Sequence, residues 1–169
     1  MASRLGDAGT SHSPLYGFSL DGFPIAGPYQ SSRVLAQSCW QKRDYSSSSP
    51  TGCSDGLRSC LLKDQYDYTK GTTTASSSGP SPSGTTSTQS GNTISAASGI
   101  FYQDYFFNST CSKNGGQSLD QFNGHSHSPY GYHYHLTIDS KGALAFPYGP
   151  SLNYYGCGTC STSVCDTTT

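Results

Sequence analysis

Four of the chain's five histidines lie in one stretch of twelve residues, GHSHSPYGYHYH, at 124–135. Imidazole nitrogens bind zinc and copper ions, and they also exchange protons near neutral pH. His133 and His135 are two residues apart, the spacing that puts both side chains on one face of a β-strand. His125 and His127 repeat this spacing. The stretch therefore predicts a metal site, a catalytic centre or a hydrogen-bonded brace within the fold.

The metal hypothesis depends on how the two histidine pairs are positioned. On a strand, the Cα atoms of His133 and His135 lie about 7 Å apart, which lets both rings reach one ion. Tyr132 and Tyr134 then face the other side. A turn at 129–131 would bring the preceding histidines back beside this strand. Three or four imidazoles without a thiolate suit zinc or copper, and copper has the higher affinity.

The carboxylates of Asp21 and Asp120 are the expected partners of these rings. Either one could be a further ligand, with Asp21 the tentative choice, or an acceptor that orients a ligating ring. The structural alternative is a buried histidine that donates directly to a carboxylate or a carbonyl oxygen. We favour this direct bracing slightly over metal binding. Catalysis by a His-Asp general base or a metal-bound water is the third possibility, and no catalytic residue is assigned.

The composition limits how such a site can be supported. The chain has 169 residues and a net charge of −1, and charged residues make up 11% of it, well under the usual quarter or so. Ser and Thr together number 48. We expect one small, irregular β-rich domain over 1–169 (α+β minor), built from short strands and hairpins and braced by disulfides. A Ser/Thr-rich insertion at about 71–98 and polar termini at 1–13 and 165–169 complete it.

The local patterns predict where the elements lie. Apolar residues at helical spacing favour short helices at 31–42 and 56–66. The segment 99–107 has the strongest β composition. A β-hairpin is predicted over 131–149, with Gly142 in the left-handed region of its turn. The Ser/Thr tract cannot bury enough apolar surface to order itself, so we expect a neighbouring subunit or glycans to hold it.

Cysteines and a glycosylation sequon indicate an oxidising compartment. The sequon is Asn108-Ser109-Thr110, and the Ser/Thr tracts offer further sites for O-linked sugar. No apolar signal segment follows Met1, but we give the cysteines and the sequon more weight and predict an extracellular or cell-surface protein. The odd number of cysteines leaves one unpaired or intermolecular. The cysteines expected in disulfides are Cys39, Cys53, Cys60, Cys111, Cys157, Cys160 and Cys165.

Four ordered motifs resemble the YHYH domain family, which is named for the tetrapeptide at 132–135. The motifs are DGFPIAGPY at 21–29, LDQFNGH at 119–125, YGYHYHLT at 130–137 and FPY at 146–148. The resemblance covers roughly 16–30 and 119–157, and the Ser/Thr tract is an insertion between them. It implies a secreted or periplasmic protein with a suspected metal site.

By residue, the resemblance gives importance to Asp21, Asp120, Asn123, His125, His133 and His135. His127 is not part of the family pattern, and the cysteine often found in the family is replaced here by Phe122. We expect a structural hydrogen-bond network made of Asp21, Asp120, Asn123, Tyr132 and Tyr134.

These observations predict an extracellular structural glycoprotein that assembles with copies of itself into a fibril or surface layer. Its cofactors would be N-linked and O-linked glycans. The alternative is a secreted module that holds copper or zinc at the histidines, and the third is a hydrolase. The low charge and the lack of a basic stripe argue against nucleic acid. No apolar run approaches the length of a membrane span.

Overall fold

The computed structural model describes residues 2–46, 51, 58–62, 72–111, 118–151 and 153–156. The chain divides into two compact units. One joins the residues up to Cys39 with those from Thr110 onward, and the other is Trp40–Ser109. The expected Ser/Thr-rich insertion lies within the second unit. Short strands dominate both, and the only helical turns in the described ranges are the 3₁₀ helices Ala2–Leu5 and Tyr102–Asp104. The predicted β-rich fold is confirmed.

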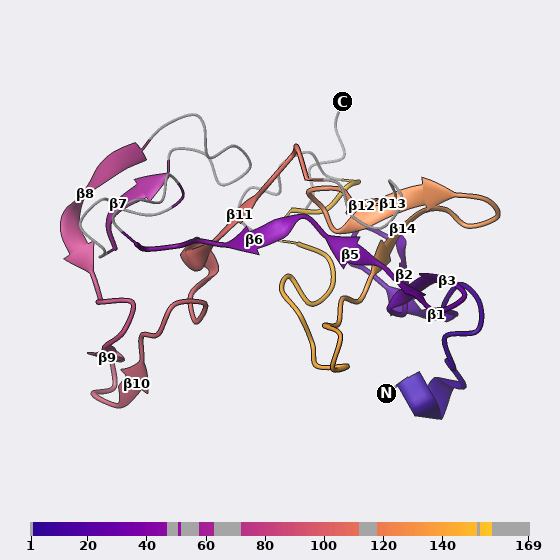
Figure 1. The fold of residues 1–169 in the computed structure, drawn as a ribbon, viewed down its shortest axis with the longest axis horizontal. Helices are drawn as coiled ribbons and strands as arrows, with labels where there is room; N and C mark the ends of the chain where they lie inside the picture. The colour runs from indigo at the N-terminus through magenta and orange to yellow at the C-terminus, as the bar shows by residue number, and fades with distance from the viewer. Residues whose placement is uncertain are drawn as a thin grey trace. The chain divides into compact units, whose positions relative to one another are not determined.

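The first unit contains a four-stranded sheet in the order β1-β2-β14-β13 (Figure 1). Strand β14 pairs antiparallel with β13 and parallel with β2, so segments from both ends of the chain meet in one sheet. The strands are β1 (Leu15–Phe18), β2 (Pro24–Ala26), β13 (Gly124–His127) and β14 (Gly131–His135). Two smaller pairs are β3 (Tyr29–Ser31) with β4 (Val34–Leu35), and β5 (Gln37–Ser38) with β12 (Ser118–Leu119).

The second unit consists of three two-stranded antiparallel pairs. They are β6 (Trp40–Lys42) with β11 (Tyr105–Phe107), β7 (Arg58–Leu62) with β8 (Thr72–Gly79), and β9 (Thr85–Ser87) with β10 (Thr93–Ser95). The predicted strand at 99–107 is therefore present only at its C-terminal end, after a 3₁₀ turn.

The two predicted helices are wrong. The segment 31–42 forms the end of β3 and the strands β4, β5 and β6, because β4 pairs with β3, β5 with β12 and β6 with β11. Arg33 takes a φ of 58° in the turn between β3 and β4, which no helix interior allows. In the segment 56–66, the described residues 58–62 form β7, and the others lie outside the described ranges. Tertiary pairing overrides the weak local helix pattern.

The core is lean and largely polar. The described apolar side chains that are buried are Ala26, Ala36, Cys39, Trp40, Ala96, Phe106, Leu119 and Tyr134. The buried polar side chains outnumber them by one: Ser13, Gln30, Arg43, Arg58, Asp104, Asn123, His133, His135 and Thr137. Burying so many polar groups is tolerable only when they are hydrogen-bonded, so each unit is stabilised internally by its own polar network.

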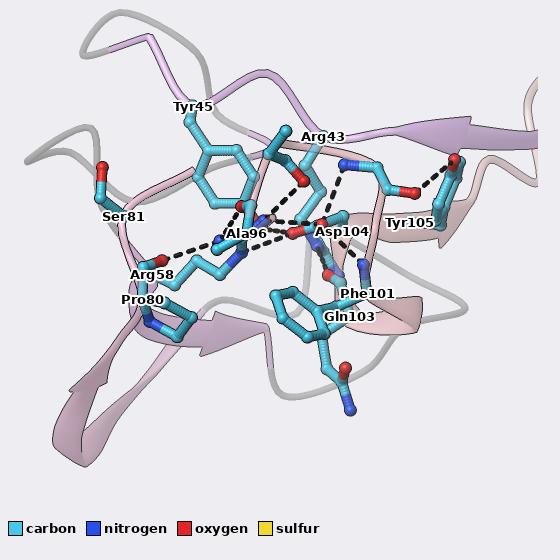
Figure 2. A network of polar contacts seen from close by, with 12 residues as sticks. Arg43, Tyr45, Arg58, Pro80, Ser81, Ala96, Phe101, Gln103, Asp104 and Tyr105 are labelled. Carbon is cyan, nitrogen blue, oxygen red and sulfur yellow. Dashed lines mark hydrogen bonds and ion pairs between the residues drawn. The ribbon is translucent and has the colours of Figure 1, made fainter. Parts of the chain in front are cut away.

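One such network holds the Ser/Thr-rich tract (Figure 2). The guanidinium of Arg58 donates two hydrogen bonds to Asp104, at 2.7 and 2.8 Å. It also donates to the carbonyl oxygens of Pro80, Ala96 and Ala97. Carbonyls that precede and follow the β9–β10 hairpin in the sequence are thus bound to one buried cation. The chain itself thus binds the described part of this tract at three positions, and the expected neighbouring subunit or glycan coat stays a prediction.

A disulfide joins Cys39 to Cys111 in the first unit, with their Cα atoms 5.8 Å apart. The other predicted disulfide cysteines have side chains outside the described ranges. The predicted turn near Gly142 is confirmed: Gly142 has a φ of 80°, and Ile138 and Leu144 form an antiparallel bridge. The predicted hairpin over 131–149 is wrong in its first half, because β14 pairs with β13 and β2 instead.

Candidate metal centre

The hairpin of β13 and β14 brings four histidines together. Its register places His125 directly opposite His133. The turn between the strands covers residues 128–130, as Pro129-Tyr130-Gly131 predicts. Because side chains alternate along a strand, His125, His127, His133 and His135 share one face of this hairpin. Their ring centroids lie about 5 Å from those of their neighbours, for example 4.8 Å between His125 and His133.

The fifth histidine, His12, joins this cluster from the loop before β1. Its Nε2 lies 3.1 Å from Nε2 of His133, 121 residues away in the sequence. Its ring packs against the edge of His127 with 4.4 Å between centroids. All five histidines of the chain therefore meet at one place. Sequence analysis missed His12, and its only signal was that it is the one histidine outside the 124–135 stretch.

The nitrogen atoms converge at distances that suit a metal ion. Nε2 of His125 lies 3.2 Å from Nε2 of both His133 and His135. One nitrogen from each of His12, His125, His127 and His133 lies within 4.8 Å of every other. Four nitrogens bound to a tetrahedral zinc at about 2.0–2.1 Å are about 3.3 Å apart. The pairs at 3.1 and 3.2 Å match this spacing, and the full set of four, which does not include His135, lies within the wider limit of 4.8 Å.

The tautomers of the rings leave Nε2 free to bind. Nδ1 of His12, His133 and His135 lies 2.8, 2.9 and 2.6 Å from the carbonyl oxygens of Ser13, Gly131 and Gly27. A carbonyl oxygen only accepts, so each Nδ1 must carry the hydrogen. In the neutral rings Nε2 then has only a lone pair. The lone pairs of His12 and His133 face each other at 3.1 Å, an arrangement that a cation between them would make favourable.

Burial keeps these rings neutral. Desolvation lowers the pKa of His12, His125, His133 and His135 below 6.5, and neighbouring imidazoles lower it further. The pKa of His125 falls to about 4 and that of His135 to about 2. His133 and His135 are fully buried. Neutral imidazole is the form that binds a metal, so the cluster is ready to bind at neutral pH.

Asp120 supports the hairpin from its opposite face. The hydroxyl of Tyr132 donates to Asp120 at 3.0 Å, and the backbone N–H groups of Phe122 and Gly124 donate at 2.9 and 3.1 Å. Burial raises the pKa of Asp120 although these bonds oppose it. Gly124 leaves room for this contact, because a Cβ there would come 2.6 Å from Cζ of Tyr132 and 2.7 Å from the carbonyl oxygen of His133.

Asp21 accepts a hydrogen bond from Tyr134, as Asp120 does from Tyr132. The hydroxyl of Tyr134 donates to Asp21 at 2.6 Å, and the N–H of Gly156 donates to it at 3.0 Å. Burial would raise the pKa of Asp21, but hydrogen bonds from Ser19, Tyr134 and the backbone lower it overall. The structure therefore differs from the expectation that Asp21 and Asp120 bind the histidines. Both carboxylates bind the tyrosines of β14, and Asp21 is not part of the histidine cluster.

Asn123 fixes the end of β14. Its amide Nδ2 donates to the carbonyl oxygens of His135 and Gly149, both at 2.9 Å, and the side chain is fully buried. Its backbone has a φ of 67°, which asparagine tolerates better than most residues. Asp21, Asp120, Asn123, Tyr132 and Tyr134 thus form one support for the histidine face. Asn108, the predicted glycosylation site, is half-buried at the end of β11 in the other unit.

Comparison with models of known protein families, with curated proteins and with solved structures gives no match. The resemblance to the YHYH domain stays a prediction. The described part of the chain has no helix long and apolar enough to cross a membrane.

Proposed function

We propose that this protein is a metal-binding module that holds one zinc or copper ion per chain at the histidine cluster. The observation that carries the proposal is the close approach of Nε2 atoms whose rings already donate through Nδ1 to carbonyl oxygens. Such rings have the correct tautomer before the metal arrives, and their backbone acceptors hold them in orientation. Copper is expected to bind more tightly, and four imidazole ligands also suit tetrahedral zinc.

The ligand set favours holding the ion over hydrolysis. His12, His125, His127 and His133 supply four nitrogens, which fill the positions of a tetrahedral ion. A catalytic zinc keeps one position open for water or substrate. The proposed role is therefore storage, delivery or stabilisation of the fold by the ion, and the hydrolase hypothesis has less support.

Metal titration of the full chain tests this proposal. Protein stripped with a chelator is titrated with Zn²⁺ and with Cu²⁺ in a calorimeter, and we expect one ion per chain. The double variant His125→Ala with His133→Ala should lose this binding. The matched control is Asp139→Asn, an exposed turn residue of the same unit that contacts only backbone N–H groups. If the wild-type chain binds neither ion at micromolar concentrations, the proposal is wrong.

Self-assembly is a second candidate, and one surface favours it. The edge strand β1 and the turn after it expose Phe18 and Leu20, at 69% and 90%. Exposed apolar side chains at the edge of a sheet are suited to pairing with another chain. A subunit that assembles this way could also hold a metal. Light scattering of the wild type and of Phe18→Ser with Leu20→Ser tests it: particles that stay monomeric at high concentration would contradict assembly.

A further inference from the structure

His12 differs from the other four histidines in how the fold holds it. The others belong to one hairpin, in which the strands β13 and β14 are paired over four residue pairs. His12 belongs to the loop before β1, which pairs with neither strand. Its ring stacks on the ring of Tyr130, with 4.9 Å between centroids and an angle of 25°. Of the histidines in the cluster, His12 can therefore move without opening the hairpin.

The position of His12 depends on its neighbour Ser13. The carbonyl oxygen of Ser13 accepts from Nδ1 of His12 at 2.8 Å, which orients the ring. Ser13 is fully buried, and both its N–H and its hydroxyl bond to the backbone of Tyr29 at 2.8 Å. The bonds that fix Ser13 to Tyr29 therefore also fix the carbonyl oxygen that orients His12.

Asp7 in turn holds Ser13. Its Oδ2 accepts from the Ser13 hydroxyl at 2.6 Å and from the Tyr16 hydroxyl at 2.9 Å. Its Oδ1 accepts from the N–H of Gly9 at 3.2 Å, and this bond closes a short turn between Asp7 and Gly9. A continuous set of hydrogen bonds therefore runs from Asp7 through Ser13 to the ring of His12. Asp7 forms none of these hydrogen bonds to a ring of the cluster, and its charge acts on His12 through space, where it raises the pKa of that ring while burial lowers it overall.

We propose that Asp7 is a positioning residue of the metal site, which acts through Ser13 to hold His12 as the ligand that controls release of the ion. This inference rests on the proposed function. An ion that leaves must lose its ligands one at a time, and His12 is the one outside the hairpin. When its support is weakened, the ring leaves the ion more often and the ion dissociates faster. Residues that orient a ligand in this way typically contribute 10- to 100-fold to metal affinity.

The experiment measures how fast Co²⁺ and Zn²⁺ leave the full chain when a chromogenic chelator is added in a stopped-flow instrument. We expect Asp7→Asn to accelerate release about 10- to 100-fold. His12→Ala should accelerate it at least as much and should change the visible absorption spectrum of bound Co²⁺. The matched control, Asp139→Asn, removes a carboxylate that also binds backbone N–H groups in the same unit, and it should release the ion at the wild-type rate.

The double variant separates positioning from a general structural role. If Asp7 acts through His12, then Asp7→Asn has no further effect on release when His12 is already alanine. If Asp7→Asn accelerates release equally in both backgrounds, or in neither, the inference is wrong while the proposed metal site stands. If the wild-type chain binds neither Co²⁺ nor Zn²⁺, the proposed function fails, and the inference fails with it.

Discussion

Replacing Asp104 by asparagine removes one charge from the centre of the Trp40–Ser109 unit and keeps the size of the side chain. The carboxylate is fully buried and forms the ion pair with Arg58. It also accepts from the hydroxyl of Tyr45 at 2.6 Å and from the N–H groups of Gly99 and Phe101 at 2.9 and 3.1 Å. Five donors therefore point at two carboxylate oxygens. The change tests whether this network holds the unit together.

The expected cost follows from these contacts. Asparagine has one acceptor oxygen, and its NH₂ group would face donors where the second oxygen was, so at least two of the hydrogen bonds are lost. Arg58, whose side chain is 7% exposed, would keep its charge without a counterion. Breaking one side of a buried ion pair costs about 3–5 kcal/mol. Whole domains have stabilities of about 5–15 kcal/mol, so the variant should lose a large part of the unit's stability.

Trp40 provides the assay. It is the chain's single tryptophan, it belongs to this unit and it is 6% exposed, so its emission reports unfolding here. Urea titrations compare the wild type with Asp104→Asn and with the control Asp44→Asn, an exposed carboxylate bound only to Ser46. We expect the control to change the free energy of unfolding by less than about 0.5 kcal/mol. A loss under about 1 kcal/mol for Asp104→Asn would refute the central role of the ion pair.

Three further predictions concern pH, the hairpin and the disulfide. Burial would raise the pKa of Asp104, but the hydrogen bonds from Arg58 and Tyr45 lower it below the ordinary value of 3.8. The contribution of the Asp104 carboxylate to the free energy of unfolding is therefore complete above pH 3.8. It is lost as the pH falls through the lower pKa of the folded state. Acid titration of Trp emission should show this loss in the wild type and not in Asp104→Asn. Gly124→Ala pushes the ring of Tyr132 away from Asp120 and should weaken metal binding by about 10- to 100-fold in calorimetry. The same change at Gly17, where an added Cβ meets nothing within 4 Å and the φ angle is not positive, should leave binding unchanged. Replacing both cysteines of the described disulfide, 72 residues apart, should lower the free energy of unfolding in urea by about 4 kcal/mol, and an unchanged midpoint would contradict this.

Local patterns predicted the part of the site that local structure builds. Alternation with a period of two placed His133 and His135 on one face, and the turn at 129–131 depends only on adjacent residues. The composition also predicted a polar, disulfide-containing β fold. These features need no knowledge of distant residues, which is why the sequence was sufficient for them.

Contacts between distant residues account for what was missed. The approach of His12 to His133 spans 121 residues, and no local pattern indicates it. Asp21 and Asp120 were assigned to the histidines because a carboxylate can ligate a metal ion or accept a hydrogen bond from a ligating ring. They accept hydrogen bonds from Tyr132 and Tyr134 instead, because the hydroxyl groups on the opposite face of β14 also need acceptors. Two strands of the segment 31–42, β5 and β6, formed for the same kind of reason, since their pairing partners lie beyond residue 104.

The disulfide between Cys39 and Cys111 also has a consequence for the covalent path of the chain. The Cα atoms of Cys39 and Cys111 are 5.8 Å apart, a distance that a tight turn can span. For the histidine unit, the residues between the two cysteines therefore form a loop whose ends are already close together. Such a loop could be gained, lost or exchanged during evolution without changing the positions of β1, β2, β13 or β14. Because the disulfide closes this loop, a chain cut by a protease between the two cysteines remains one molecule, with its five histidines together, until the disulfide is reduced.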